Sequence, residues 1–423
     1  MTERSLRGDT RGLLLMLGLP TLGLALAAGI LTTYGPVVLL KVAHSPARVG
    51  ALIGGEGAFA LAIPLLAGVL SDRLPPSPLG RRLPFVFLGT PLVIAGLLLI
   101  AWSPTYAVAG LAVLLFFIGY YLYYPPYRAL YADLLPLQLQ PRAQGSQAVY
   151  RGIGLGVALM AGGLLLDIWQ PLPFIIAGGI LLATTLTLSP VVRARADCSG
   201  SATGSDPTTT VGSLLRNRRM MTFAGANAMW EFSFAGLKTF IVLYVVKGLG
   251  RSPAMASAVI AVVAVAYIGG APLAGRLADR WGIVPVMTWA AIVYGLGLCV
   301  GMIPTTITPS LVLLPFVALA GAVLLTLPQA LAFTLAPAGG QGAAAGLVDV
   351  SRGLGLVLGP LVVGVAVSGS SSFLTATHGY AAMWPVIGVA VLLSVPLLRR
   401  LDPSVSTALS LGGTRSPASS SSP

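Results

Sequence analysis

The sequence is poor in charge, cysteine and histidine. Only 9% of its 423 residues are charged and only 12 are acidic, whereas 56% are hydrophobic and the mean hydropathy is +0.89. Because a soluble protein carries about 25% charged residues, this composition excludes an ordinary soluble domain and indicates a membrane protein. Its two cysteines, Cys198 and Cys299, are expected at different depths, so no disulfide framework is predicted.

Motifs for metal, nucleotide or covalent chemistry are also missing. His44 and His378 stand apart from any cluster of metal ligands, and the chain has no nucleotide-binding motif and no nucleophile beside a base. The runs GIGLG and GLGLVLG do not precede a Lys-Ser/Thr pair, so they indicate close helix contacts rather than phosphate loops. The sequence therefore predicts no metal, no cofactor, no ATP-driven pump and no enzyme.

Apolar runs of about 20 residues, each long enough to cross roughly 30 Å of hydrocarbon, recur along the chain. They predict an all-α membrane protein with twelve transmembrane helices in two pseudo-symmetric six-helix halves. The expected spans are 12–33, 46–70, 83–101, 106–134, 145–166, 171–190, 218–246, 254–278, 283–303, 309–333, 342–366 and 380–398. The expected domains are the halves 1–192 and 218–402, a cytoplasmic linker at 193–217 and a disordered Ser/Pro-rich tail at 403–423.

The cations that give the net charge of +13 are distributed as this topology requires. With a cytoplasmic N-terminus, the opposite side collects only four cations, Lys41, Arg48, Lys247 and Arg251, and most arginines fall on the cytoplasmic side. By the positive-inside rule, both termini and the linker are cytoplasmic in a multi-pass protein of the plasma membrane. The charge thus indicates orientation and not a nucleic-acid partner. We expect a monomer. Arg4, Arg7 and Arg11 before an apolar run also fit a signal peptide, but its cleavage would break the repeat.

Two pairs of similar segments show that the sequence contains an internal repeat. AGVLSDR at 67–73 matches AGRLADR at 274–280, and each copy closes an apolar run. A second match, QGSQAVYRGIGLG from Gln144 and AGLVDVSRGLGLV from Ala345, pairs Arg151 with Arg352 and Gly154 with Gly355. Two parallel six-helix halves with a cytoplasmic linker are the architecture in which a solute binds between the halves near mid-membrane.

The duplicated Gly-x-Leu-x-Asp-Arg loop resembles the signature loop of the major facilitator superfamily (MFS), a superfamily of secondary transporters. The resemblance implies a cytoplasmic latch in which the glycine lets helices approach and the Asp-Arg pair locks the opposing half. The predicted latch residues are Gly68, Asp72, Arg73, Arg81, Arg82, Arg151, Gly275, Asp279, Arg280, Asp349 and Arg352. Asp349 is expected to pair with Arg73, or alternatively with Arg352, and Arg151 with Asp279.

Two further motifs resemble the sucrose/proton symporters and the proton-associated sugar transporters. The first loop runs SDRLPPSPLGRRLPF from Ser71, and the fourth span ends PYRALYADL from Pro126. The family has Ser-Asp-Arg, a spacer and Gly-Arg-Arg-Arg-Pro-Phe in the loop, and Pro-x-Arg-Ala-Leu-x-Ala-Asp-Leu in span 4. This chain departs at Leu83, which replaces the third basic residue, and at Phe117, which stands where plant members carry their proton-binding aspartate.

Charged residues inside spans are costly, at about 2.5–3.5 kcal/mol each at a helix centre, and therefore mark a cavity or a partner. Glu56 lies mid-span among three glycines, and Glu231 lies mid-span with Lys238 two turns further on the same face. A carboxyl buried without a close cation takes up a proton readily, as a proton carrier must. We predict Glu56, Glu231 and Lys238 as proton-coupling residues. A static ion pair between either acid and Lys238 is the alternative.

Arg128 shares a helix face with Tyr124, Tyr121 and Tyr120. An arginine beside tyrosine rings can bind sugar hydroxyls while a ring stacks on the sugar, or can hold an anion. These four residues are the predicted substrate-binding set. Alternatively, Arg128 extends to the cytoplasmic surface and pairs with Asp133.

Together these features predict a secondary active transporter that moves a small solute by alternating access, importing a sugar or glycoside with protons. One alternative is a proton-driven exporter of apolar or cationic compounds, which a tyrosine-rich span and acidic groups would also serve. Another is a non-transporting membrane sensor, against which the intact latch loops argue. The expected partners are the solute, protons and the lipid bilayer.

Overall fold

A computed structural model describes residues 3–73, 82–134, 140–188, 217–302, 307–335 and 341–401. Within these ranges every regular element is a helix, and ten helices are long and apolar enough to cross a membrane. The prediction of an all-helical membrane protein is confirmed. The expected linker, except its last residue, and the expected tail lie outside the described residues.

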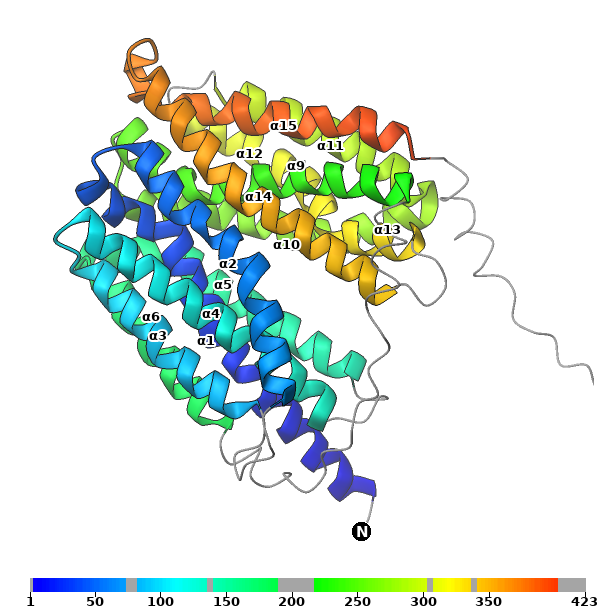
Figure 1. Cartoon of the computed structure of the whole chain (residues 1–423). Helices are drawn as coiled ribbons and strands as arrows, with labels where there is room; N and C mark the ends of the chain where they lie inside the picture. Colours follow the sequence, from blue (N-terminus) through cyan, green and yellow to red (C-terminus); the bar gives the residue numbers. More distant parts are fainter. Residues whose placement is uncertain are drawn as a thin grey trace, which may run out of the picture. The chain divides into compact units, whose positions relative to one another are not determined.

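The first six predicted spans correspond to α1 (Glu3–Ala43), α2 (Pro46–Arg73), α3 (Leu83–Ala101), α4 (Tyr106–Leu134), α5 (Gln140–Ile168) and α6 (Leu172–Leu186) (Figure 1). The largest difference is at α1, which continues well past the predicted end at residue 33. Its polar residues do not stop the helix, because Thr32 donates its hydroxyl to the Ala28 carbonyl 2.6 Å away within the helix itself.

The remaining spans are α9 (Arg218–Leu243), α10 (Pro253–Trp281), α11 (Ile283–Val300), α12 (Ile307–Thr326), α13 (Pro328–Leu335), α14 (Gln341–Ser370) and α15 (Met383–Arg399). A π-helical turn, η3 (Tyr244–Gly248), extends α9, and two short 3₁₀ turns, η4 (Thr375–Thr377) and η5 (Tyr380–Ala382), precede α15. The predicted span 309–333 is two helices, broken at Leu327, because Pro328 has no N–H to donate into the preceding turn.

The helices form two compact units. One unit comprises Met1–Gly204, Gly236–Ala261 and Leu356–Ala381, and the other comprises Ser205–Ala235, Val262–Gly355 and Ala382–Pro423. The helices α9, α10 and α14 therefore contribute to both units. The division into two six-helix halves at the linker stays a prediction based on the repeat.

In the first unit, α3 lies beside α4 and α6, and α1 lies beside α5 and α6 (Figure 1). Small residues allow these close approaches: a Cβ on Gly89 of α3 would lie 2.6 Å from the Gly119 carbonyl oxygen of α4. Fully buried aromatic side chains fill the space between the helices, among them Tyr123 and Phe116 on α4 and Phe174 on α6. This packing holds one face of α4 rigidly against the unit.

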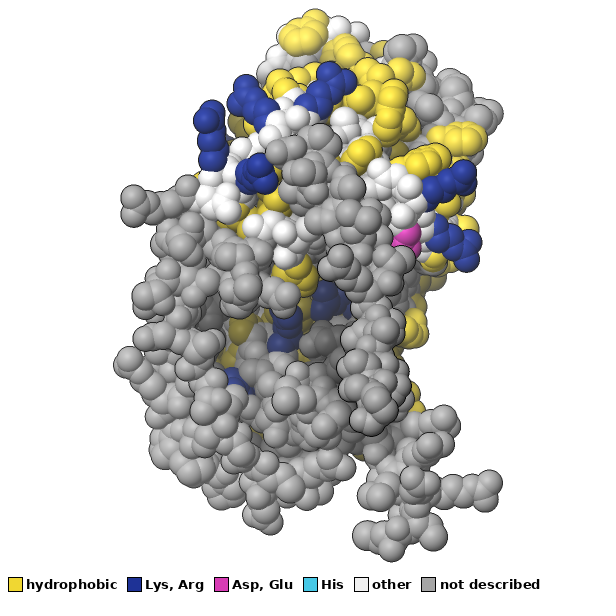
Figure 2. Space-filling model, turned by 90° about the vertical axis from the view of Figure 1, so that its right-hand side faces the viewer, with side chains coloured by type: hydrophobic (Ala, Val, Ile, Leu, Met, Phe, Trp, Pro, Cys, Tyr) yellow, Lys and Arg dark blue, Asp and Glu magenta, His cyan; other side chains and the backbone are white. Residues whose placement is uncertain are grey.

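Exposed arginines stand at the start of α9 and at the ends of α10 and α15: Arg218, Arg219, Arg276, Arg280, Arg399 and Arg400. On the face seen in Figure 2, described basic side chains gather among hydrophobic ones, with little acidic surface. This concentration of arginine at helix ends fits the side predicted to be cytoplasmic. The orientation of the termini stays a prediction.

Candidate functional site

The centre of the candidate site is a cluster of three tyrosines on α4, Tyr120, Tyr121 and Tyr124, called here the tyrosine cluster. The Tyr120 and Tyr124 rings are stacked with centroids 5.7 Å apart, and the Tyr121 ring meets Tyr120 edge-on at 5.0 Å. The spacing of four residues places Tyr120 and Tyr124 on the same face of the helix. The following Pro125 and Pro126 lack N–H groups, so the carbonyls of Tyr121 and Leu122 lose their usual helical donors.

Two arginines from different helices flank Tyr124. The Arg128 guanidinium carbon lies 5.6 Å from the centroid of the Tyr124 ring, one turn along α4. The Arg151 guanidinium carbon, on α5, lies at the same distance, and its terminal nitrogen donates to the Tyr124 hydroxyl over 2.5 Å. Both contacts are cation–π interactions. Both arginine side chains are exposed, so their charged groups are available to a ligand.

An acid lies at the other end of the tyrosine cluster. The Tyr121 hydroxyl donates to Glu56 Oε1 of α2 over 3.4 Å, and Glu56 is half-buried. Phe117 stacks with Phe59 of α2 at 6.3 Å. The structure thus brings together Glu56, the tyrosine cluster and Arg128 from the predicted sets. It adds Arg151, which was expected to act in the latch.

The second unit holds a separate polar cluster. Arg352 Nε of α14 lies 3.8 Å from Glu231 Oε2 of α9, so Arg352 pairs with Glu231. Next to this pair, the buried Asn227 side chain donates to the Ser351 hydroxyl over 2.7 Å. Glu231 therefore has a cation from a neighbouring helix. Lys238 is half-buried on α9.

A directed chain of hydrogen bonds joins α1, α5 and α10 in the first unit. The Tyr34 hydroxyl donates to the Leu159 carbonyl at 2.6 Å, so it accepts from the Ser257 hydroxyl, also at 2.6 Å. Ser257 Oγ in turn accepts from the Gly163 N–H at 2.9 Å. Tyr34 and Ser257 are buried. All the hydroxyl protons in this chain are used, which fixes α10 against α1 and α5.

Two more contacts strengthen the same end of these helices. The Asp167 carboxylate of α5 accepts from the Ala254 N–H at 2.9 Å, at the start of α10, where a negative charge favours a helix N-terminus. The Ser368 hydroxyl of α14 accepts from the Ala47 N–H at 3.0 Å, at the start of α2. We call the set of contacts around Tyr34, Asp167 and Ser368 the closed end.

Four of the eleven predicted latch residues cannot be placed. The side chains of Asp72 and Arg73, in the last turns of α2, and all of Arg81 are outside the described residues, as is the side chain of Asp133; of Gly68 only its place in α2 is described. Arg82 precedes α3 and is half-buried. Asp349, Asp279 and Arg280 are exposed, and the Arg280 guanidinium lies 5.9 Å from the Trp281 ring, while Gly275 is half-buried. The latch stays a prediction.

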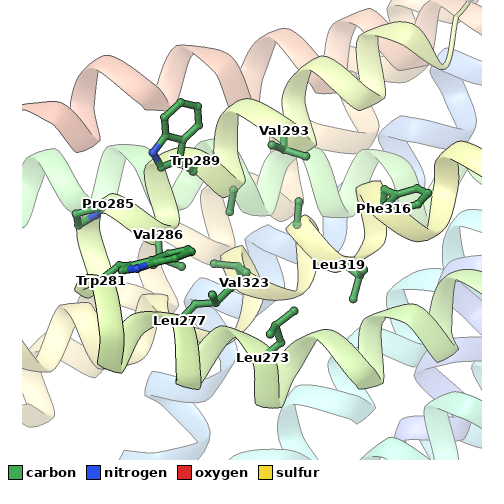
Figure 3. A pocket seen from close by; sticks show the side chains of 12 residues that line it. Leu273, Leu277, Trp281, Pro285, Val286, Trp289, Val293, Phe316, Leu319 and Val323 are labelled. Atoms are coloured by element: carbon green, nitrogen blue, oxygen red, sulfur yellow. The ribbon is translucent and has the colours of Figure 1, made fainter.

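The second unit also has a groove of about 590 Å³ between α10, α11 and α12 (Figure 3). Its lining is apolar throughout and includes the exposed rings of Trp281, Trp289 and Phe316. The described residues that line it include no charged side chain. An apolar exposed surface of this kind fits contact with lipid, and tryptophans near helix ends are typical of membrane interfaces.

Several residues that form hydrogen bonds between helices were not singled out from the sequence. Asn227 is a buried amide inside an apolar span, which is a usable signal because such a residue needs a partner in lipid. Tyr34 and Ser257 gave no such signal, since single hydroxyl residues are common in membrane helices. Their pairing depends on how α1 and α10 pack.

Comparison with known proteins agrees with this architecture. Residues 26–376 match the model of the MFS_1 like family. The chain is similar in fold to a bacterial homologue of the human lysosomal transporter Spinster, in an inward-facing and occupied conformation, with a TM-score of 0.74 and 16% identity over 97% of this chain and 99% of that one. It is also similar to the nucleoside transporter NupG, with a TM-score of 0.74 and 16% identity over 92% and 98% of the two chains. The peptide transporter POT bound to sulfate matches with a TM-score of 0.70 and 14% identity over 93% and 95%. No curated protein sequence matches the chain.

Proposed function

The chain belongs to the MFS_1 like family and is a secondary transporter of the major facilitator superfamily, and we propose that it takes up a sugar or glycoside together with protons. The solved structures of similar fold are described as moving nucleosides and peptides, which are chemically unlike each other. The solute must therefore be inferred from the chain's own residues.

The observation that carries the proposal is the series of contacts that runs from Glu56 through the tyrosine cluster to Arg128. Tyrosine rings stack on the apolar faces of sugars, and guanidinium donors bind their hydroxyl groups. Glu56 contacts this cluster through Tyr121, so an acid able to carry a proton lies next to the groups that would bind the solute. The loop and span-4 motifs shared with sucrose/proton symporters support the same assignment.

The same geometry disfavours the exporter of cationic compounds. Arg128 and Arg151 both flank Tyr124, so a cationic solute at the tyrosine cluster would meet two like charges. A neutral or negatively charged solute meets no such repulsion.

In MFS transporters, access to a central site alternates as one repeat moves against the other. We assign the closed end to the outer side of a plasma membrane, with both termini cytoplasmic, because the arginine-rich helix ends favour that orientation. Glu231 and Lys238 are the second candidates for coupling, after Glu56, because Glu231 already has Arg352 as a partner.

The test is uptake of a panel of labelled sugars and glycosides by the purified protein in liposomes, with and without an imposed pH gradient, acidic outside. We expect at least one sugar to accumulate above its external concentration only when the gradient is present. Protein-free liposomes are the control. Equilibration without accumulation would overturn proton coupling, and uptake of no sugar would overturn the solute class.

A further inference from the structure

The arginine at the equivalent position of each repeat has a different kind of partner. Arg352 in the second repeat lies 3.8 Å from a Glu231 carboxylate oxygen. Arg151, its counterpart in the first repeat, donates to the neutral Tyr124 hydroxyl. The same helix position therefore has an anionic partner in one repeat and a neutral partner in the other.

Two equivalent glycines show which residue of the first repeat occupies the position of Glu231. A Cβ on Gly355 of α14 would lie 2.6 Å from the Glu231 Cβ of α9, so the helices cross there. A Cβ on Gly154 of α5 would overlap the Leu22 carbonyl of α1, which marks the same crossing in the first repeat. Leu22 thus stands where the second repeat has Glu231. No acidic residue occurs in α1 from Gly12 to its end.

The first repeat also adds a second cation. Arg128 flanks the same Tyr124 ring, and its counterpart in the repeat is the neutral Gln329. Because both guanidinium carbons lie 5.6 Å from one ring centroid, they cannot be further apart than twice that distance. Both cations therefore lie at the same part of the tyrosine cluster. In the part of the chain that the structure describes, neither arginine has an acidic group within 4.0 Å.

Two exposed guanidinium groups around one ring, with no acidic partner among the described residues, form an electrostatic site that an anion would complete. Arginine presents a planar set of donors that matches the oxygen atoms of a carboxylate or a phosphate, and such charge-assisted hydrogen bonds are about twice as strong as neutral ones. A neutral sugar would leave both positive charges uncompensated. An anionic group on the solute would supply the charge that Glu231 supplies in the second repeat.

We propose that the solute is an acidic sugar, whose carboxylate or phosphate group binds Arg128 and Arg151 while its ring packs on the tyrosine cluster. This proposal rests on the proposed function, because it specifies the sugar that the same site takes.

The test compares matched neutral and anionic sugars by calorimetry on the purified full-length protein: glucose and galactose, their uronic acids and their 6-phosphates. At least one anionic form should bind about tenfold or more tightly than its neutral parent. The uronic acids and the 6-phosphates distinguish a carboxylate from a phosphate. Uptake of the same panel in liposomes accompanies the binding data.

Substitution of each arginine tests whether these two residues cause the preference for the anionic sugar. Arg128→Gln and Arg151→Gln should each bring binding of the anionic sugar down to near that of the neutral parent. Arg48→Gln is the matched control, because Arg48 is exposed and lies 5.7 Å from the Tyr106 ring, away from the tyrosine cluster. Its binding should equal that of the wild type.

Neutral sugars that bind and accumulate as well as their acids would overturn this inference and leave the proposed function standing. The wild-type panel gives this answer even if a variant fails to fold. If the chain neither binds nor takes up any of the six compounds or any sugar of the uptake panel, the proposed function and this inference both fail.

Discussion

The Tyr34 hydroxyl of α1 lies 2.6 Å from the Ser257 hydroxyl of α10, within the hydrogen-bond chain of the closed end. Tyr34→Phe removes both the bond from Ser257 and the bond to Leu159. Each neutral hydrogen bond contributes about 1 kcal/mol, so we expect the open fraction at this end to rise about fivefold or more. Alkylation of a cysteine placed at the buried Val38, in a chain without its native cysteines, measures that fraction.

The control for this change is Tyr123→Phe. Tyr123 shares a hydrogen bond with Thr185 at 3.1 Å, between α4 and α6, and has no part in the closed end. Labelling at position 38 should not change in this variant. An unchanged rate in Tyr34→Phe as well would mean that the closed end does not depend on this hydroxyl.

The crossing of α5 and α1 gives a prediction for stability. Gly154→Ala places a methyl group against the Leu22 carbonyl, and overpacking of this kind costs about 1–3 kcal/mol. Gly156→Ala, two residues further, meets nothing within 4 Å and should leave the Tm in detergent unchanged or slightly raised, because alanine favours a helix over glycine. Equal Tm values for the two variants would show that α5 does not approach α1 as described.

Arg128→Lys tests the solute-binding role of Arg128. The change keeps the positive charge but loses the planar set of donors, so solute affinity should fall about tenfold while the protein still folds. Calorimetry with the best sugar of the panel measures the affinity, and Arg48→Lys is the control. Equal affinity in the wild type and in Arg128→Lys would assign Arg128 to structure alone.

Asp349→Asn tests the predicted cytoplasmic latch of Asp72, Arg73 and Asp349. Removing the charge should favour inward-open conformations, because the latch would lose the partner of Arg73. Cysteine labelling on the two sides of the membrane reports the shift. Asp279→Asn, at the repeated loop, is a second variant with the same expected direction. Labelling that stays the same on both sides in Asp349→Asn would remove Asp349 from the latch.

The helices could be predicted from the sequence because a helix that crosses lipid needs a long apolar run. The boundaries of α3 and α4 agree with the prediction, whereas the break before Pro328 was missed inside an otherwise continuous run. Glu56 and Arg128 could be singled out because charge is rare in these spans. Their neighbours were harder to predict.

Partners between helices depend on the rotation of each helix about its axis, which an apolar run does not specify. The sequence therefore suggested Asp279 for Arg151, and Arg73 or Arg352 for Asp349. The structure places Tyr124 beside Arg151 and Glu231 beside Arg352, two contacts that the sequence did not suggest. The repeat did reveal that Arg151 and Arg352 are equivalent. Only the structure shows that the two arginines have different partners, Arg151 on α5 with α4 and Arg352 on α14 with α9.

We propose that this transporter moves its solute together with protons and that Glu56, beside the tyrosine cluster, carries the proton. Uptake and exchange in liposomes by the wild type and Glu56→Gln test it most directly. Glu56→Gln should abolish accumulation driven by a pH gradient and preserve exchange of labelled for unlabelled solute, because exchange needs no net proton movement. A Glu56→Gln protein that still concentrates its solute would contradict the claim, and Glu231 or another coupling ion would replace Glu56.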